Sequence, residues 1–180
     1  MKKSLLKEIL GFSIYLLIIL ALTYLIIAFV GQRTVVHGDS MENTLHDGDN
    51  LIVDKWTYHT HDPERFDIVV FPYKYEKDTY YIKRVIGMPG ESVRIDSYGN
   101  IFINDVVLEE SYGREAIRDA GLAGSTVYLA SDEYFVLGDN RNNSSDSRDP
   151  GIGPVKRKDI IGKAWVRIYP FDAFGKIEKN

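Results

Sequence analysis

The chain has 180 residues, with 22 Lys plus Arg against 26 Asp plus Glu, four His and no cysteine. Its length suits one modest domain, its apolar fraction of 44% excludes a mostly disordered chain, and its net charge of −4 argues against general nucleic-acid binding. Without cysteine there is no disulfide framework, so the fold must be stable through its core alone.

The N-terminal segment is by far the most apolar part of the chain. From Ile9 to Val30, nineteen of twenty-two positions are Ala, Val, Ile, Leu, Phe or Tyr, and no charged residue lies between Glu8 and Arg33. A helix of this length rises about 33 Å, which matches the hydrocarbon core of a bilayer. The sequence therefore predicts a transmembrane helix over 9–30, with the lipid bilayer as a partner.

Two other interpretations of this segment are a cleavable signal peptide and the buried helix of a soluble domain. A cleavable signal has an apolar run of about 7 to 15 residues and a small residue at the cut, whereas this run is longer and ends in the β-branched Val30. Three lysines precede the span, so the positive-inside rule places residues 1–8 in the cytoplasm and residues 31–180 outside. We expect an uncleaved, single-pass anchor in the cell membrane.

Residues 31–180 are dominated by short β-branched or aromatic runs bounded by Gly, Pro, Asn and Asp. This pattern predicts a mainly β fold, an irregular β-barrel or β-sandwich, preceded by the one N-terminal transmembrane helix. Turn residues at 97–100 and at 104–105 indicate two tight hairpins. A polar insertion over 109–125 is expected to contain a short helix at about 113–122. The expected strands cover 50–53, 67–71, 79–86, 92–95, 101–103, 127–129, 134–137 and 164–169.

Four segments could carry chemistry. Singly, each has an ordinary structural explanation: a serine between polar residues is commonly a turn residue, a Lys-Arg pair in a strand is commonly a solvated face, and a loop rich in Asn, Ser, Asp and Arg can bond to itself. The four segments are Gly38-Asp39-Ser40-Met41, Tyr81-Ile82-Lys83-Arg84-Val85, Gly87-Met88-Pro89-Gly90, and the loop from Gly138 to Arg148.

Strand alternation singles out the lysine. Tyr81, Lys83 and Val85 share one face of the expected strand, while Ile82 and Arg84 point the other way. Lys83 thus has apolar neighbours, and a lysine removed from water has a lowered pKa. A neutral lysine can take the proton of a serine hydroxyl, which makes a Ser-Lys pair an alternative to Ser-His-Asp.

Histidine is the rival base, and the chain has His37, His46, His59 and His61. His37 is three positions from Ser40, a poor place for a partner that must approach the hydroxyl from the side. His59 and His61 could supply two metal ligands, but no Cys or third clustered ligand accompanies them. We expect exposed loop histidines and no metal.

Taken in order, the segments resemble a known family. The membrane exit is followed by Gly-Asp-Ser-Met-x-x-Thr-Leu, then by Tyr-Ile-Lys-Arg-Val-Ile-Gly-Met-Pro-Gly-Glu, and then by Gly-Asp-Asn-Arg-x-Asn-Ser-x-Asp-Ser-Arg. This arrangement resembles the bacterial type I signal peptidases of the Gram-positive kind, and the resemblance extends from the anchor to the C-terminus.

The resemblance implies a membrane-tethered serine endopeptidase that removes signal peptides from exported preproteins after a small residue, in the Ala-x-Ala pattern, without a cofactor. It implies that Ser40 is the nucleophile and Lys83 the general base, with Met41 following the serine as in the family. Some relatives carry a serine that assists the oxyanion where this chain has Gly38. The oxyanion must then be stabilised by the Ser40 backbone N–H, with one further donor at most.

The resemblance also implies supporting residues in the last segment. Ser144 matches the serine that hydrogen-bonds the lysine amine and aims it. Asp146 and Arg148 match a pair that holds the loops of the site together. Asn142 stands where some relatives have Asp, so a structural role for a charge at that position is not expected here.

Three other functions remain to be compared. A self-cleaving repressor of the DNA-damage response also uses a Ser-Lys pair, but it is cytoplasmic and lacks the apolar span of residues 9–30. The endoplasmic-reticulum signal peptidase has His where this chain has Lys83. A membrane-anchored domain that binds extended peptides without cutting them would have no need of Ser40, Lys83 and Ser144 together.

Overall fold

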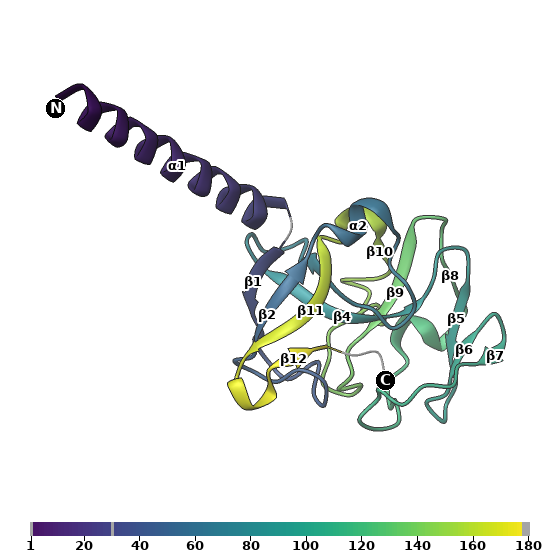
Figure 1. Ribbon diagram of the computed structural model, residues 1–180. Coiled ribbons are helices and arrows are strands. Elements are labelled where there is room, and N and C mark those ends of the chain that lie inside the picture. Colours follow the sequence, from purple (N-terminus) through teal and green to yellow (C-terminus); the bar gives the residue numbers. More distant parts are fainter. Residues whose placement is uncertain (1, 30, 178–180) are drawn as a thin grey trace.

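The computed structural model describes residues 2–29 and 31–177, with side chains of the N-terminal helix described from Lys7 to Leu25. Helix α1, Lys2–Phe29, leaves the β-rich body as a long rod (Figure 1). Its segment Lys7–Leu25 has a mean hydropathy of 2.1 and is not buried against the rest of the chain. Among the described residues it is the one helix with the length and composition to cross a membrane. The expected end of the span at Val30 lies outside the described residues.

An antiparallel sheet of eight strands forms the larger part of the body (Figure 1). Its order is β1-β2-β11-β3-β4-β9-β10, and β12 pairs with β11. The short helix α2, Thr57–Thr60, follows β2. The strands are β1 Gly31–Val35, β2 Asn50–Asp54, β3 Ile68–Pro72, β4 Tyr80–Gly87, β9 Glu133–Leu137, β10 Val155–Lys156, β11 Gly162–Tyr169 and β12 Gly175–Lys176.

A second sheet of four antiparallel strands has the order β7-β6-β5-β8. Both expected hairpins are confirmed here, because Gly99 (φ 86°) turns the chain between β5 and β6, while Asn104 and Asp105 (φ 50° and 64°) turn it between β6 and β7. The strands are β5 Ser92–Ile95, β6 Ile101–Ile103, β7 Val106–Val107 and β8 Val127–Tyr128.

The expected mainly β fold is confirmed, and each of the eight expected strands has a counterpart. The larger sheet is not a closed barrel, since the end strands β1 and β10 do not pair with each other within the described residues. Strands β1, β7, β10 and β12 were not predicted, because three of them have only two residues and β1 directly follows the apolar helix.

The helix expected over 113–122 is not formed. The insertion contains only one turn of 3₁₀ helix, η1, Gly121–Gly124. Two further 3₁₀ turns are η2, Arg157–Asp159, and η3, Phe171–Ala173. The backbone N–H groups of Arg114 and Arg118 donate to the loop after β9, and the Arg118 N–H is one that a helix would have bonded internally. Tertiary hydrogen bonds thus replace the local ones.

The core has three apolar clusters that fix the positions of β4 and its neighbours. Ile86 of β4 and Leu137 of β9 pack with Val93 and Ile95 of the second sheet, so this cluster joins the two sheets. Val85 packs in a second cluster on the opposite face of β4. The middle of β4 therefore lies deep in the body, and the polar residues there, unusually, are buried too.

Candidate active site

A cavity of about 910 Å³ lies where three distant segments meet. We call it the first cavity. Its walls come from β1 and the loop after it (33–41), from the start of β4 with the turn before it (78–83), and from the loop after β9 (142–145). The first, second and fourth of the segments singled out in the sequence all contribute to it, whereas Gly87-Met88-Pro89-Gly90 does not.

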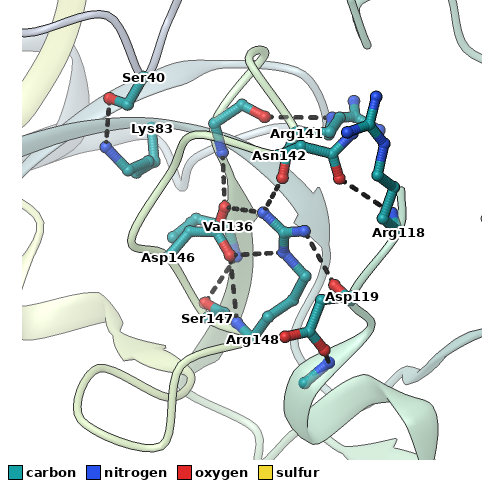
Figure 2. A network of polar contacts seen from close by, with 12 residues as sticks. Ser40, Lys83, Arg118, Asp119, Val136, Arg141, Asn142, Asp146, Ser147 and Arg148 are labelled. Atoms are coloured by element: carbon teal, nitrogen blue, oxygen red, sulfur yellow. Dashed lines mark hydrogen bonds and ion pairs between the residues drawn. The ribbon is translucent and has the colours of Figure 1, made fainter. Parts of the chain in front are cut away.

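Ser40 and Lys83 meet in this cavity. Lys83 Nζ lies 2.8 Å from Ser40 Oγ, although the residues are 43 positions apart (Figure 2). The amine also donates to the Ile82 carbonyl at 3.0 Å, which holds it in place. Lys83 is only 4% exposed. This is the distance and environment that proton transfer from a hydroxyl to an amine requires.

Burial lowers the pKa of Lys83 from 10.5 to about 8. The charges of Asp146 and Asp139 act in the opposite direction, but desolvation is the larger effect. The lysine shares its strand face with Val85 and with Tyr81, whose ring centroid lies 5.1 Å from Nζ. The face predicted from strand alternation is confirmed, and about a tenth of the amine is neutral at pH 7, against roughly one part in 3,000 at the ordinary pKa.

The loop between β1 and β2 (36–49) is fixed around Ser40. Met41 is 1% exposed and packs in the third apolar cluster, with Leu45 and Leu51. Asn140 clamps the backbone, because its N–H donates to the Ser40 carbonyl and its Nδ2 donates to the Asp39 carbonyl, both at 3.1 Å. These contacts restrict the serine from both sides.

The Ser40 backbone N–H has no hydrogen-bond partner within the part of the chain that the structure describes. It is free to donate to an oxyanion. The Gly38 N–H is not, because it donates to Asp47 Oδ1 at 2.8 Å. A Cβ added at position 38 would meet no atom within 4 Å, but the φ of +83° there strains any residue other than glycine.

A buried ion pair that the sequence did not reveal joins the strand of Lys83 to the loop after β9, and Thr44 ties the loop of Ser40 to it. Arg84 is 1% exposed and its guanidinium forks onto Asp139, with Nε–Oδ1 at 2.8 Å and Nη2–Oδ2 at 2.6 Å. Thr44 Oγ1 donates to the same carboxylate. Arg84 does point away from Lys83, but it reaches a partner 55 positions later, and the solvated face considered for the Lys-Arg pair is wrong.

The expected pair of Asp146 and Arg148 is present and fully engaged (Figure 2). The carboxylate, which is buried, accepts Arg148 Nη2 at 2.8 Å, Nε at 2.9 Å and the Gly138 N–H at 3.1 Å. Arg148 Nη1 reaches the Asp119 carbonyl at 3.1 Å. The pair therefore closes the loop after β9 and ties it to the insertion.

Ser144 differs from expectation. Its Oγ is buried without a hydrogen-bond partner, and it does not bond to the amine of Lys83. It lies instead beside Gly138, where an added Cβ would come 2.2 Å from Ser144 Oγ and 2.4 Å from the Ser40 carbonyl oxygen. The hydroxyl is thus close to the serine backbone, and only a glycine fits between them.

Asn142 has a structural role that a charged residue could not fill. Its Nδ2 donates to the Ala116 carbonyl and its Oδ1 accepts the Arg118 N–H, both at 2.9 Å. A carboxylate has no donor for the first bond. The Asn142 amide therefore supplies both the donor and the acceptor that the backbone of the insertion requires.

The histidines are exposed, as expected. His37 lines the first cavity, but Ser40 Oγ is bonded to Lys83. Among the described residues no group of three or more His, Asp or Glu has an arrangement that could hold a metal ion.

Comparisons with known proteins identify the family of this chain. The model of the family "Signal peptidase, peptidase S26" matches residues 9–169. Signal peptidase I P of Bacillus subtilis subsp. natto is 38% identical over 87% of each chain. A probable signal peptidase I-2 of Synechocystis is 40% identical over 82% of this chain and 67% of its own. Signal peptidase I S of Bacillus subtilis is 34% identical over 94% of each.

A crystal structure of a signal peptidase I from Enterococcus faecalis is also similar, at 33% identity and a TM-score of 0.48, over 57% of this chain and 97% of that one. The family match covers well over half of the chain, and it includes all three walls of the first cavity. The chain therefore belongs to the signal peptidase family, peptidase S26.

Proposed function

We propose that this protein is a membrane-anchored serine endopeptidase that cleaves signal peptides from exported preproteins, with Ser40 as nucleophile and Lys83 as general base. The observation that carries the proposal is the contact of Lys83 Nζ with Ser40 Oγ at 2.8 Å, made by a lysine that burial has brought to a pKa of about 8. Family membership supports the substrate class.

In the proposed reaction Ser40 Oγ attacks the scissile carbonyl while Lys83 Nζ takes the hydroxyl proton. The Ser40 N–H stabilises the oxyanion of the tetrahedral intermediate. When the peptide C–N bond breaks, the ammonium of Lys83 gives its proton to the leaving amine. The same amine then deprotonates the water that hydrolyses the acyl-enzyme, and serine and neutral lysine are restored.

The supporting residues act by position. We assign Met41 to anchoring the serine loop in the core, and Asp146 with Arg148 to closing the loop that presents Ser144 to the cavity. The buried contacts of these three side chains support these roles.

We propose that residues 9–30 anchor the enzyme, with residues 1–8 in the cytoplasm and the domain of 31–180 outside. The uncharged stretch of α1 after Glu8 and the three lysines in its first two turns support this orientation. Protease added to cells stripped of their wall should degrade the β-rich domain. Protection of the domain from that protease would contradict the orientation.

The substrate pattern, a small residue before the cut and another two positions earlier, is proposed from the family. Apolar side chains line part of the first cavity, among them Val36, Met41 and Ile82, and they favour apolar groups there. Replacing the residue before the cut with Leu should abolish processing, and efficient cutting after Leu would contradict the pattern.

The test is to incubate the detergent-solubilised full chain with a labelled preprotein and map the new N-terminus. Ser40→Ala, Lys83→Ala and the double variant should each lose nearly all cleavage, and the losses should not add, because neither group works without the other. Lys158→Ala, an exposed lysine outside the first cavity, is the matched control. Substantial activity in Lys83→Ala would show that another residue is the base.

A further inference from the structure

A second cavity, of about 460 Å³, lies on the other side of the loop that closes the first. Asn142, Ser144 and Ser145 line both cavities, so the two sites are separated by a single stretch of chain. The far wall belongs to the insertion and to the end of the β9–β10 loop. The other lining residues are Arg118, Asp119, Gly121, Arg141, Arg148, Asp149 and Pro150.

Two residues of this cavity carry buried polar atoms without a partner. Arg141 is held by Glu110 at 2.7 Å and by the Gly138 carbonyl at 3.1 Å, yet its Nη2 has no acceptor. Ser144 Oγ is the second such atom. Buried donors are nearly always satisfied in folded proteins. Arg141 Nη2 therefore indicates a ligand in the second cavity that brings a hydrogen-bond acceptor, whereas Ser144 Oγ lies against Gly138 and the Ser40 carbonyl.

The walls of the second cavity are joined rigidly. Asn142 binds the backbone of the insertion through Ala116 and Arg118, both at 2.9 Å. The exposed rim carries both signs of charge, from Arg118, Asp119 and Asp149. A rim of mixed charge does not select a small anion, but it suits a polypeptide of varied sequence that is held through its main chain.

The direction of the substrate follows from where the membrane span lies. β1 follows α1 almost directly and lines the first cavity, so the part of a preprotein still in the bilayer approaches from the β1 side (Figure 1). The second cavity includes Gly121 of η1, and Ala123 of that turn packs with Val93 in the core of the second sheet. It therefore lies beyond Ser144, on the side away from β1.

We infer that the second cavity is the subsite for the first residues of the mature protein, those that follow the scissile bond. An extended segment crosses the wall of Asn142 to Ser145, and one of its main-chain carbonyls accepts from Arg141 Nη2. The inference rests on the proposed function, since it takes a cleaved preprotein as the ligand.

The absence of cysteine from the chain permits a direct test by disulfide trapping. Arg118→Cys is introduced into the full chain with Ser40→Ala, which keeps the substrate intact. Preproteins with a single cysteine at each of the first six mature positions are added under mild oxidation. At least one position should cross-link about tenfold faster than to Lys158→Cys, because a disulfide needs Cβ atoms about 3.5–4.5 Å apart. Lys158 is also exposed and lies outside both cavities.

A third enzyme variant, Val35→Cys with Ser40→Ala, tests the opposite side of the first cavity. It should trap a cysteine placed in the signal peptide before the cut. If that trap forms but mature cysteines link to Val35→Cys, or no faster to Arg118→Cys than to Lys158→Cys, the inference is overturned and the proposed function stands. If wild-type enzyme cleaves no preprotein and neither side traps, the proposed function itself fails.

Discussion

Gly138 lies where the loop after β9 passes the backbone of Ser40, and its replacement by alanine tests how closely these two segments must fit. A Cβ at this position would lie 2.4 Å from the Ser40 carbonyl oxygen and 2.2 Å from Ser144 Oγ. Rotation of the Ser144 hydroxyl does not relieve the crowding, because Ser144 Cβ would lie 2.6 Å from the added Cβ. The Ser40 carbonyl belongs to the backbone that carries the nucleophile. The methyl group therefore has to push the Ser40 loop and the β9–β10 loop apart.

The size of the shift follows from ordinary contact distances. Because van der Waals contact to a Cβ begins at about 3.4 Å, the Ser40 carbonyl has to retreat by about 1 Å. A misplacement of about 1 Å at a reacting group costs roughly 100-fold in rate. Crowding of this kind costs about 1–3 kcal/mol of stability, which is less than the 5–15 kcal/mol of a typical domain. Gly138→Ala should therefore fold and be nearly inactive.

The assay is kcat/KM for preprotein cleavage by solubilised enzyme, with the free energy of unfolding measured on the same samples. Gly175→Ala is the matched control, because a Cβ there meets no atom within 4 Å. It should keep the activity of the unmodified chain. Activity of Gly138→Ala within about threefold of the unmodified enzyme, or a loss explained by its unfolded fraction, would refute the reasoning about position.

Three more predictions concern the charge of Lys83 and its surroundings. Because the pKa of Lys83 is about 8, kcat/KM should rise about tenfold from pH 7 to a plateau near pH 9, and metal chelators should not change it. An acid limb near pH 6.5 that vanishes in His37→Ala would show that histidine is the base. Lys83→Met should raise the free energy of unfolding by about 3 kcal/mol at pH 7. A lysine pKa that is lowered in the folded state costs stability at low pH, and this cost disappears between pH 8 and 10.5. A gain in stability that grew with pH would contradict a lowered pKa. Arg84→Ala should lower the free energy of unfolding in urea by about 3–5 kcal/mol. It should also move the acid limb of kcat/KM to higher pH, because the unneutralised charge of Asp139 raises the pKa of Lys83. An unmoved limb would show that Asp139 has no influence, and Arg84→Lys is the control that keeps the charge.

The local features of this protein could be predicted from its sequence. Strands β4 to β6 and their hairpin turns follow from alternating side chains and from residues that tolerate positive φ, such as Gly99 and Asn104, and both signals act between near neighbours. The face of β4 on which Lys83 lies follows from the same alternation. The apolar helix is apparent from composition alone.

What only the tertiary structure decided depends on contacts between distant residues. Ser40 and Lys83 are 43 positions apart, and Arg84 finds its carboxylate 55 positions later. From the sequence, Arg84 could equally have been exposed to solvent. It is buried with Asp139 only because the β9–β10 loop packs against β4. The helix predicted over 113–122 is lost for the same reason, because Asn142 binds the Arg118 N–H and the Ala116 carbonyl, which a helix would have paired. The lowered pKa of Lys83 is likewise a property of burial, which the whole fold produces and no short segment determines.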